Sequence, residues 1–183
     1  MKGLILLANG FEEAEAIITI DILRRAKLDV TLASVGLDLT VTSSHNIQVL
    51  ADTRLSDVIS EEYGFLIIPG GLKSVLTFHS SSLVSEIVEE FVLNQKIIGA
   101  ICAGPTVLSR LGLLKGKKFT CFPGLDEYLK SGAYHPEKEV IVANNIITAR
   151  AMAHTIEFAL EIVKKILGKE EAKRIEKAIT GIR

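Results

Sequence analysis

A cysteine stands where an apolar run ends and a helical pattern begins. The run Ile97–Ile101 is followed directly by Cys102, and small residues, Ala100 and Gly104, stand two positions before and after it. This is the spacing of a nucleophile elbow, in which a sharp strand-to-helix turn exposes a reactive side chain. Free N–H groups and the positive end of the following helix favour a thiolate there, which predicts a reactive cysteine. A buried core cysteine is the alternative.

A glycine pair follows another apolar run, in the segment "FLIIPGGLKS". Gly70 and Gly71 allow a backbone to approach a ligand closely. The N–H groups of Gly71 and Ala103 are predicted to form an oxyanion hole for a substrate oxygen or for an oxidised sulfur. A plain turn is the alternative. The segment matches neither the phosphate-binding P-loop nor the dinucleotide-binding glycine motif.

Three carboxylates open the first helical pattern. Glu12 and Glu13 are explained as anions at a helix N-terminus. Glu15 differs, because Ile18 and Ile22 extend the same helical stripe as apolar residues. Partial burial should raise the pKa of Glu15 and allow it to hold a proton for a neighbouring sulfur or substrate oxygen.

These residues need elements that bring them together. Continuous apolar runs predict strands, and 3.6-residue periodicity predicts helices between most of them. The predicted strands are Leu4–Ala8, Val30–Ser34, Phe65–Pro69, Ile97–Ile101, Glu139–Ala143 and Ile146–Ala149. The predicted helices are Glu12–Ala26, Ser82–Leu93, Thr106–Leu111 and Thr155–Leu167. Strands buried on both faces indicate an α/β, doubly wound parallel sheet sandwiched by helices.

The carboxyl ends of such strands form the ligand site, so the three loops that carry Glu15, Gly71 and Cys102 should converge. The interval Asp38–Asp52 breaks the strand–helix rhythm. Two β-prone runs around a polar turn predict a hairpin appended to the sheet edge, with a chance of packing against a second subunit.

Length and composition indicate one domain, residues 1–183. Lys and Arg number 21 against 22 for Asp and Glu, and this net charge of -1 disfavours nucleic-acid binding. No apolar run approaches the roughly 20 residues that span a bilayer, so we expect a cytoplasmic protein without membrane contact. A disulfide between Cys102 and Cys121 is not expected in that compartment, and Cys121 is predicted to be structural.

The segments "ILLANGFEEAEAIITIDILRRA", "PGG" and "AICAGPTVL" resemble the ThiJ/PfpI superfamily, which is class I glutamine amidotransferase-like, in the branch of the parkinsonism-associated protein deglycase. The resemblance covers nearly the whole chain. It implies a flavodoxin-like homodimer in which Cys102 is the nucleophile and a protonated Glu15 is hydrogen-bonded to it. It also implies that Gly71 and Ala103 supply the backbone donors.

This sequence departs from the patterns of that superfamily at three places. The protease-like branch has His directly after the cysteine, whereas this chain has Ala103. Members of the deglycase branch often carry His where this chain has Phe122, and the segment "RGPG" has become Arg150–Ala153. A pocket wall and a proton shuttle have therefore changed.

The remaining histidines are candidate bases or ordinary packing residues; they are His45, His79, His135 and His154. None has metal-ligand spacing, so neither a metal nor a cofactor is expected.

Three functional hypotheses follow. The first is a cysteine-dependent hydrolase or lyase of the glyoxalase or deglycase type, acting on small aldehydes or glycated adducts without glutathione. The second is an oxidative-stress sensor or chaperone that uses the same cysteine without turnover. The third is a peptidase or amidase of the PfpI type, which lacks its base in the expected place.

Overall fold

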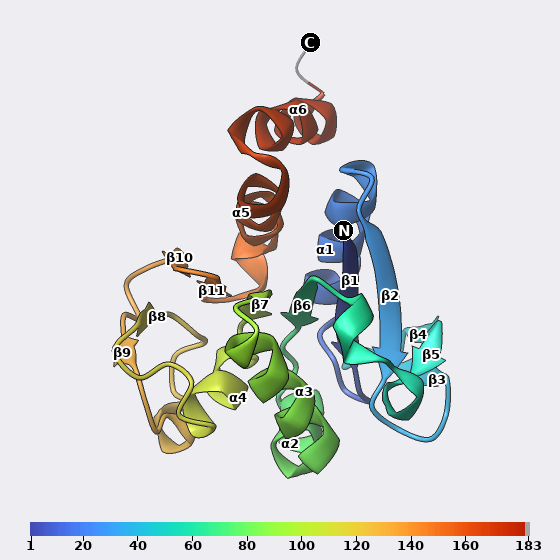
Figure 1. The fold of residues 1–183 in the computed structure, drawn as a ribbon, viewed down its shortest axis with the longest axis vertical. Coiled ribbons are helices and arrows are strands. Elements are labelled where there is room, and N and C mark those ends of the chain that lie inside the picture. The colour runs from blue at the N-terminus through green and yellow to red at the C-terminus, as the bar shows by residue number, and fades with distance from the viewer. Residues whose placement is uncertain (182–183) are drawn as a thin grey trace.

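A seven-stranded sheet runs through the protein in the order β10-β11-β7-β6-β1-β2-β5 (Figure 1). The computed structural model describes residues 1–181. The sheet strands are β1 (Lys2–Leu7), β2 (Asp29–Ser34), β5 (Thr53–Arg54), β6 (Phe65–Ile68), β7 (Ile97–Ile101), β10 (Val140–Ala143) and β11 (Ile146–Ala149). The helices are α1 (Glu13–Arg25), α2 (Leu72–Ser80), α3 (Ser82–Leu93), α4 (Pro105–Arg110), α5 (Thr155–Leu167) and α6 (Lys169–Thr180).

Each central strand buries both of its faces. In β1, Ile5 and Leu7 belong to the core under α1 and α5, whereas Leu4 and Leu6 belong to the core under α2, α3 and α4. The alternation follows the two-residue period of a strand, and burial on both sides requires the continuous apolar run seen in the sequence. The predicted α/β sheet sandwiched by helices is confirmed.

The predicted hairpin exists but is not part of the large sheet. Strands β3 (Thr40–Thr42) and β4 (Gln48–Leu50) form a separate antiparallel pair, and β5 occupies the sheet edge instead. The hairpin is bonded to the loop after β1, where the N–H of Gly10 donates to Thr42 at 2.7 Å and that of Ser44 to Phe11 at 2.8 Å. The hairpin therefore covers the carboxyl end of β1.

Strand β10 is antiparallel to β11, although all other neighbours in the large sheet are parallel. Only Asn144 and Asn145 connect the two strands, and a two-residue loop can join only an antiparallel pair. Asn144 has a φ of 57°, a left-handed conformation that asparagine tolerates in tight turns. The expected parallel sheet thus ends in one antiparallel edge strand.

Helices α2 and α6 lie at opposite ends of the molecule (Figure 1). Helix α6 exposes its lysines and buries Ala172 and Ile175. Helix α2 was not predicted, because Lys73, Ser74, Thr77 and His79 interrupt its apolar pattern. A second small sheet pairs β8 (Lys118–Phe119) with β9 (Ala133–Tyr134).

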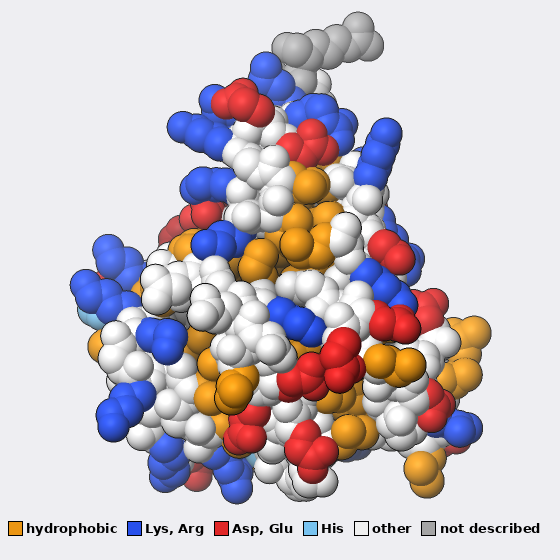
Figure 2. Space-filling model, in the orientation of Figure 1, with side chains coloured by type: hydrophobic (Ala, Val, Ile, Leu, Met, Phe, Trp, Pro, Cys, Tyr) orange, Lys and Arg blue, Asp and Glu red, His pale blue; other side chains and the backbone are white. Residues whose placement is uncertain are grey.

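Acidic and basic side chains are interspersed on the face drawn in Figure 2. Within residues 1–181, no helix is long and apolar enough to cross a membrane.

Candidate active site

The three predicted loops meet at the carboxyl ends of β1, β6 and β7. The N–H of Glu12 donates to the carbonyl of Gly70 at 3.1 Å. Gly71 has a φ of 90°, and a Cβ there would lie 2.1 Å from the carbonyl oxygen of Gly10. Only glycine fits this left-handed position and this close approach of two backbones. The second loop is therefore fixed against the first.

Cys102 occupies the corner between β7 and α4 with a φ of 60°. This left-handed conformation is sparsely populated for residues other than glycine and is characteristic of functional sites. Backbone hydrogen bonds hold this corner in place. The N–H of Cys102 donates to the carbonyl of Ala149 at 2.9 Å, and the N–H of Gly104 donates to the carbonyl of Ile101 at 2.8 Å. Pro105 is the first residue of α4, where its missing N–H costs no hydrogen bond. The predicted elbow geometry is present.

Glu15 and Cys102 meet across Gly70, although 87 positions separate them in the sequence. The N–H of Gly70 donates to Glu15 Oε2 at 2.7 Å. A Cβ on Gly70 would lie 2.5 Å from that oxygen and 3.1 Å from Cys102 Sγ. Glu15 is 1% exposed, and its other oxygen, Oε1, has no hydrogen-bond partner within the described chain. A carboxyl group and a thiol thus face each other where a side chain at residue 70 would separate them.

Glu15 and Cys102 influence each other's pKa. Burial raises the pKa of Glu15 to about 7, against the opposing hydrogen bonds from Cys102 and Gly70. Burial also raises the pKa of Cys102, and the charge of Glu15 raises it further. The sequence-based expectation of a lowered thiol pKa is therefore wrong, because burial and a neighbouring carboxylate outweigh the backbone N–H groups.

Two backbone donors reach the sulfur. The N–H groups of Ala103 and Gly71 both bond to Cys102 and oppose the rise in its pKa. They come from the elbow and from the start of α2, so their relative position is fixed by two different loops. Donors aimed at one point stabilise negative charge that develops there, on sulfur or on an oxygen attached to it.

The sulfur borders a cavity of about 340 Å³, here called the thiol pocket. The pocket is lined by Glu12, Gly71, Leu72, Cys102, Ala103 and residues 122–125. The N–H of Phe122 donates to the carbonyl of Cys102 at 2.9 Å, which fixes this wall to the elbow. Phe122 is 47% exposed. It lies in the pocket wall, the position at which the sequence analysis noted a missing histidine.

None of the four histidines lines the thiol pocket in the described part of the chain. His45 Nδ1 lies 2.6 Å from Glu13, His79 Nε2 lies 3.0 Å from Thr106, His135 Nδ1 lies 3.0 Å from Glu137, and His154 Nε2 lies 2.9 Å from Arg150. Each is engaged elsewhere, so within this chain the acid–base group next to the sulfur is Glu15.

Among residues 1–181, two groups of side chains each bring three potential metal-ligand atoms within 4.8 Å of one another: Glu12, Glu13 and His45, and Glu139, His154 and Glu157. The sequence spacing did not indicate either group, since each combines residues from distant segments. In the first, Glu12 Oε2 accepts from the N–H of Glu15 at 2.7 Å and caps α1. The absence of a metal remains a prediction.

Sequence reasoning named Cys102, Glu15, Gly71 and Ala103, and the structure brings these four together. It missed that Glu12 and residues 123–125 line the same pocket. The hydrogen bond that joins Phe122 to Cys102 is a contact between distant segments. No local pattern in the sequence signals it.

The model of the DJ-1/PfpI family matches residues 1–165. The chain is 37% identical over 179 residues to protein dj-1beta of Drosophila melanogaster, which covers 97% of this chain and 96% of that protein. It is 33% identical over 178 residues to the Parkinson disease protein 7 homolog of Danio rerio, covering 96% and 94%. It is also 39% identical to protein DJ-1 homolog B of Arabidopsis thaliana, but spans only 40% of that protein.

Solved structures agree with the sequence comparison. The crystal structure of Drosophila melanogaster DJ-1beta superposes with a TM-score of 0.93 and 36% identity, covering 98% of this chain and 97% of that one. Oxidised Toxoplasma gondii DJ-1 superposes with a TM-score of 0.91 and 34% identity, with the same coverage. Fold, family model and sequence relatives thus coincide, and the chain belongs to the DJ-1/PfpI family.

Proposed function

We propose that the protein is a cysteine-dependent enzyme that converts small reactive carbonyl compounds, or their glycated adducts, without glutathione. The observation that carries this proposal is the arrangement around Cys102. A thiol on a left-handed backbone corner borders an open pocket and faces both a buried carboxyl group and two backbone N–H donors. Nucleophile, proton carrier and oxyanion donors are the three parts that carbonyl addition requires.

The reactive form is the thiolate beside a protonated Glu15. It carries the same net charge as the thiol beside a carboxylate, so a proton can pass from sulfur to Glu15 without changing the charge of the buried pair. The N–H groups of Ala103 and Gly71 stabilise the negative sulfur. Once the pair has lost one proton, near the Glu15 pKa of about 7, a fraction of the protein holds this form.

With methylglyoxal, the aldehyde carbon is oxidised and the neighbouring carbonyl carbon is reduced within one molecule, and water then hydrolyses the product from the enzyme. The sulfur forms a bond to the aldehyde carbon, and the aldehyde oxygen receives the proton from Glu15. Glu15 then removes the hydrogen of that carbon as a proton and delivers it to the neighbouring carbonyl carbon. The hydroxyl proton on the first carbon passes to the oxygen of the second, which leaves a thioester of lactate. Water attacks the thioester, the carbon–sulfur bond breaks, and lactate leaves with the thiol regenerated.

The test is conversion of methylglyoxal to lactate by the purified protein without glutathione. Cys102→Ala should lower the rate more than about a thousandfold, since the nucleophile is lost. Cys121→Ala is the matched control and should retain the rate. Equal turnover by the wild type and Cys102→Ala would contradict the proposal.

A second function, redox sensing, is favoured by one observation. Glu15 Oε1 is buried beside the thiol and has no partner in the described chain. A protonated Oε1 would donate to an oxygen of a sulfinate at Cys102, and the Gly71 and Ala103 N–H groups would hold that oxidised sulfur. Mild peroxide should add two oxygens at Cys102 alone. Intact mass measurement detects the added mass. Oxidation of both cysteines to the same extent would count against sensing.

We further propose a homodimer. Helices α1 and α5 pack against each other, and Ile17 on α1 and Ile156 on α5 are 43% and 49% exposed. Ile47 and Leu50 expose further apolar surface on the hairpin. Light scattering after size exclusion should give twice the mass of the chain, and Ile17→Glu should shift it toward the monomer. A monomeric wild type at micromolar concentration would contradict the dimer.

A further inference from the structure

A second, larger cavity adjoins the thiol pocket and is not used by the chemistry above. It measures about 540 Å³ and is here called the polar groove; it is lined by Asn9, Gly10, residues 42–44, Asn46, Leu72 and Lys73. Leu72 is exposed and lines both cavities. A molecule that reaches past Leu72 can therefore occupy both.

Lys73 is the charged residue of the polar groove. Its stem lies against Gly10, since a Cβ on Gly10 would be 2.7 Å from Cβ of Lys73 and 3.1 Å from its Cδ. Within residues 1–181, no carboxylate forms an ion pair with its ammonium group. Asn9 Oδ1 accepts from the N–H of Thr42 at 2.8 Å, which leaves the Asn9 NH₂ as a further donor. The groove thus offers hydrogen-bond donors and one positive charge, while the Ser44 hydroxyl in its lining already donates to Glu13 Oε2 at 3.0 Å.

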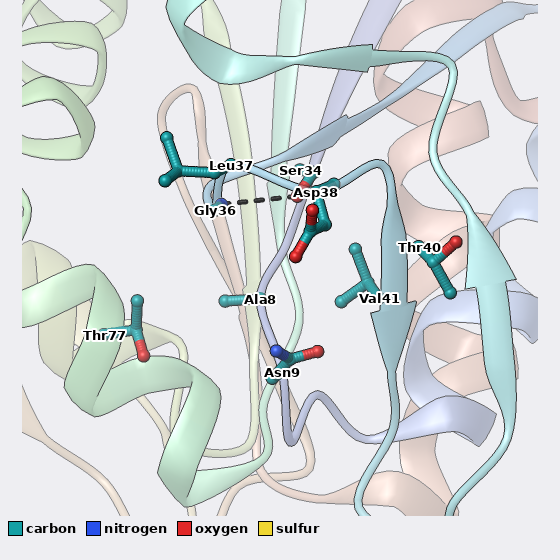
Figure 3. Close-up of a pocket in the computed structure, with 9 residues that line it drawn as sticks. All are labelled: Ala8, Asn9, Ser34, Gly36, Leu37, Asp38, Thr40, Val41 and Thr77. Atoms are coloured by element: carbon teal, nitrogen blue, oxygen red, sulfur yellow. Dashed lines mark hydrogen bonds between the residues drawn. The ribbon is translucent and has the colours of Figure 1, made fainter.

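The two neighbouring cavities each have a carboxylate, rather than a cation, in their lining. Glu12 lines the thiol pocket. On the other side of Asn9 lies a smaller cavity of about 130 Å³, into which Asp38 points from the loop after β2 (Figure 3). Like charges repel, so an anionic group is disfavoured in both. Of these three adjoining cavities, the polar groove alone has a cation and no carboxylate in its lining.

The distance between the two cavities suits a small molecule. Gly71, whose N–H reaches Cys102 Sγ, is two residues before Lys73, so their Cα atoms are at most about 7.6 Å apart. A chain with four carbon–carbon bonds between an aldehyde carbon and a carboxylate carbon spans about 5 Å when extended. The side chain of Lys73 extends beyond its Cα and can shorten the remaining distance.

Resting on the proposed function, we propose that the polar groove is the part of the substrate site that binds a carboxylate. The preferred substrates are then α-oxoaldehydes that carry a carboxylate about four bonds from the aldehyde carbon. The aldehyde lies at Cys102, the chain passes Leu72, and the carboxylate pairs with Lys73.

The experiment compares 4,5-dioxopentanoate, which has this carboxylate, with 2-oxopentanal, a neutral α-oxoaldehyde of the same chain length. The wild type should show kcat/KM at least about tenfold higher for the anionic substrate, as a charge-assisted hydrogen bond provides. Lys73→Met should remove this preference by raising KM for 4,5-dioxopentanoate at least about tenfold, and it should change KM for 2-oxopentanal much less. Lys73→Arg should keep it.

Lys115→Met is the matched control, because it removes the same charge from an exposed position that lines neither cavity. It should leave both substrates unchanged. Equal kcat/KM for the two substrates in the wild type would overturn the proposal, as would an equal loss for both in Lys73→Met.

A binding measurement tests the polar groove independently of catalysis at Cys102. Levulinate has the same carboxylate arm but no aldehyde, and 2-pentanone is its neutral counterpart. In Cys102→Ser, levulinate should bind at least about tenfold more tightly than 2-pentanone, and Lys73→Met should abolish the difference. If no oxoaldehyde is converted but levulinate binds in this way, the proposed function fails and the groove stands. If levulinate binds no more tightly than 2-pentanone, the groove proposal fails.

Discussion

The two cysteines, Cys102 and Cys121, are both largely buried but differ in what surrounds the thiol. Burial raises the pKa of both, and for Cys121 it does so to about 12. Cys121 is fully buried in the core under α2, α3 and α4 and has Tyr134 beside it. Cys102 packs partly against the opposite core and opens to the thiol pocket.

The backbones of the two residues lie close together in space, because the N–H of Phe122, next to Cys121, donates to the carbonyl of Cys102. Their side chains nevertheless belong to opposite cores. Cys102 alone combines a carboxyl partner, two backbone N–H donors and a border with an open cavity. These three features, rather than the thiol itself, distinguish a candidate nucleophile from a packing residue.

The largest expected difference is in alkylation. Iodoacetamide should modify Cys102 at least about a hundredfold faster than Cys121 in the native protein, since Cys121 must wait for local opening. In guanidinium chloride the two rates should become similar. Peptide mass mapping over time measures both. Comparable rates in the native protein would show that the structural contrast has no chemical consequence.

Gly70→Ala should break the contact that distinguishes Cys102. The new methyl group would lie 2.5 Å from Glu15 Oε2 and 3.1 Å from Cys102 Sγ, so the carboxyl and the thiol must move apart. Turnover of methylglyoxal should fall about a hundredfold through kcat, as expected for a misplaced catalytic group. Gly124→Ala is a useful control in the pocket wall, because a Cβ there meets no atom within 4 Å, although its φ of 85° costs some stability. Retained activity in Gly70→Ala would contradict the shared-proton pair.

Glu15→Gln should separate the effect of burial from the effect of the carboxyl partner. In the wild type, the alkylation rate of Cys102 should rise with pH through a midpoint near 7, where the pair loses its first proton. In Glu15→Gln no acid can take the thiol proton, so the rise near pH 7 should disappear and only the ionisation of the buried thiol above its ordinary pKa of about 8.5 should remain. Without the charge of Glu15, that later ionisation should occur at a lower pH than in the wild type. An unchanged midpoint would exclude Glu15 as proton carrier.

The raised pKa of Glu15 predicts how Glu15→Gln should change the free energy of unfolding. Folded Glu15 keeps its proton up to about pH 7, whereas the unfolded carboxyl releases it near its ordinary pKa, so stability is lost as pH rises between these values. Glu15→Gln should therefore raise the free energy of unfolding at pH 8 by roughly 1–3 kcal/mol, and by little at pH 4. Urea unfolding at both pH values measures this. A variant that is less stable at pH 8 would contradict the assignment.

The smallest expected effect comes from Phe122→His, which places a base in the wall of the thiol pocket. We expect kcat for methylglyoxal to rise about three- to tenfold, because the new imidazole is not optimally positioned. The pH profile should gain a step near the ordinary histidine pKa of about 6.5. Phe122→Asn, which has no titrating group, is the control and should not gain that step. An identical profile in both variants would show that Glu15 suffices as proton carrier.

The sequence by itself determined the central elements of the fold. Strands such as Phe65–Ile68 are buried on both faces, which leaves an uninterrupted apolar run in the sequence. The elbow was equally visible, because a left-handed corner accepts only small neighbours around Cys102. Glu15 was recognisable as a carboxylate on an apolar stripe. These signals are local, so one sequence carries them.

The tertiary structure alone decided what depends on distant contacts. The short helix α2 has no clear period, and its place is fixed by packing Val75 and Phe78 against the core. The hairpin is not at the sheet edge, because its backbone forms hydrogen bonds with the loop after β1 instead. The pKa of Cys102 is raised by burial and then by Glu15, which comes from a distant segment and meets the thiol inside the protein. Burial and the distance between charges set such energies, and neither can be computed from spacing along the chain.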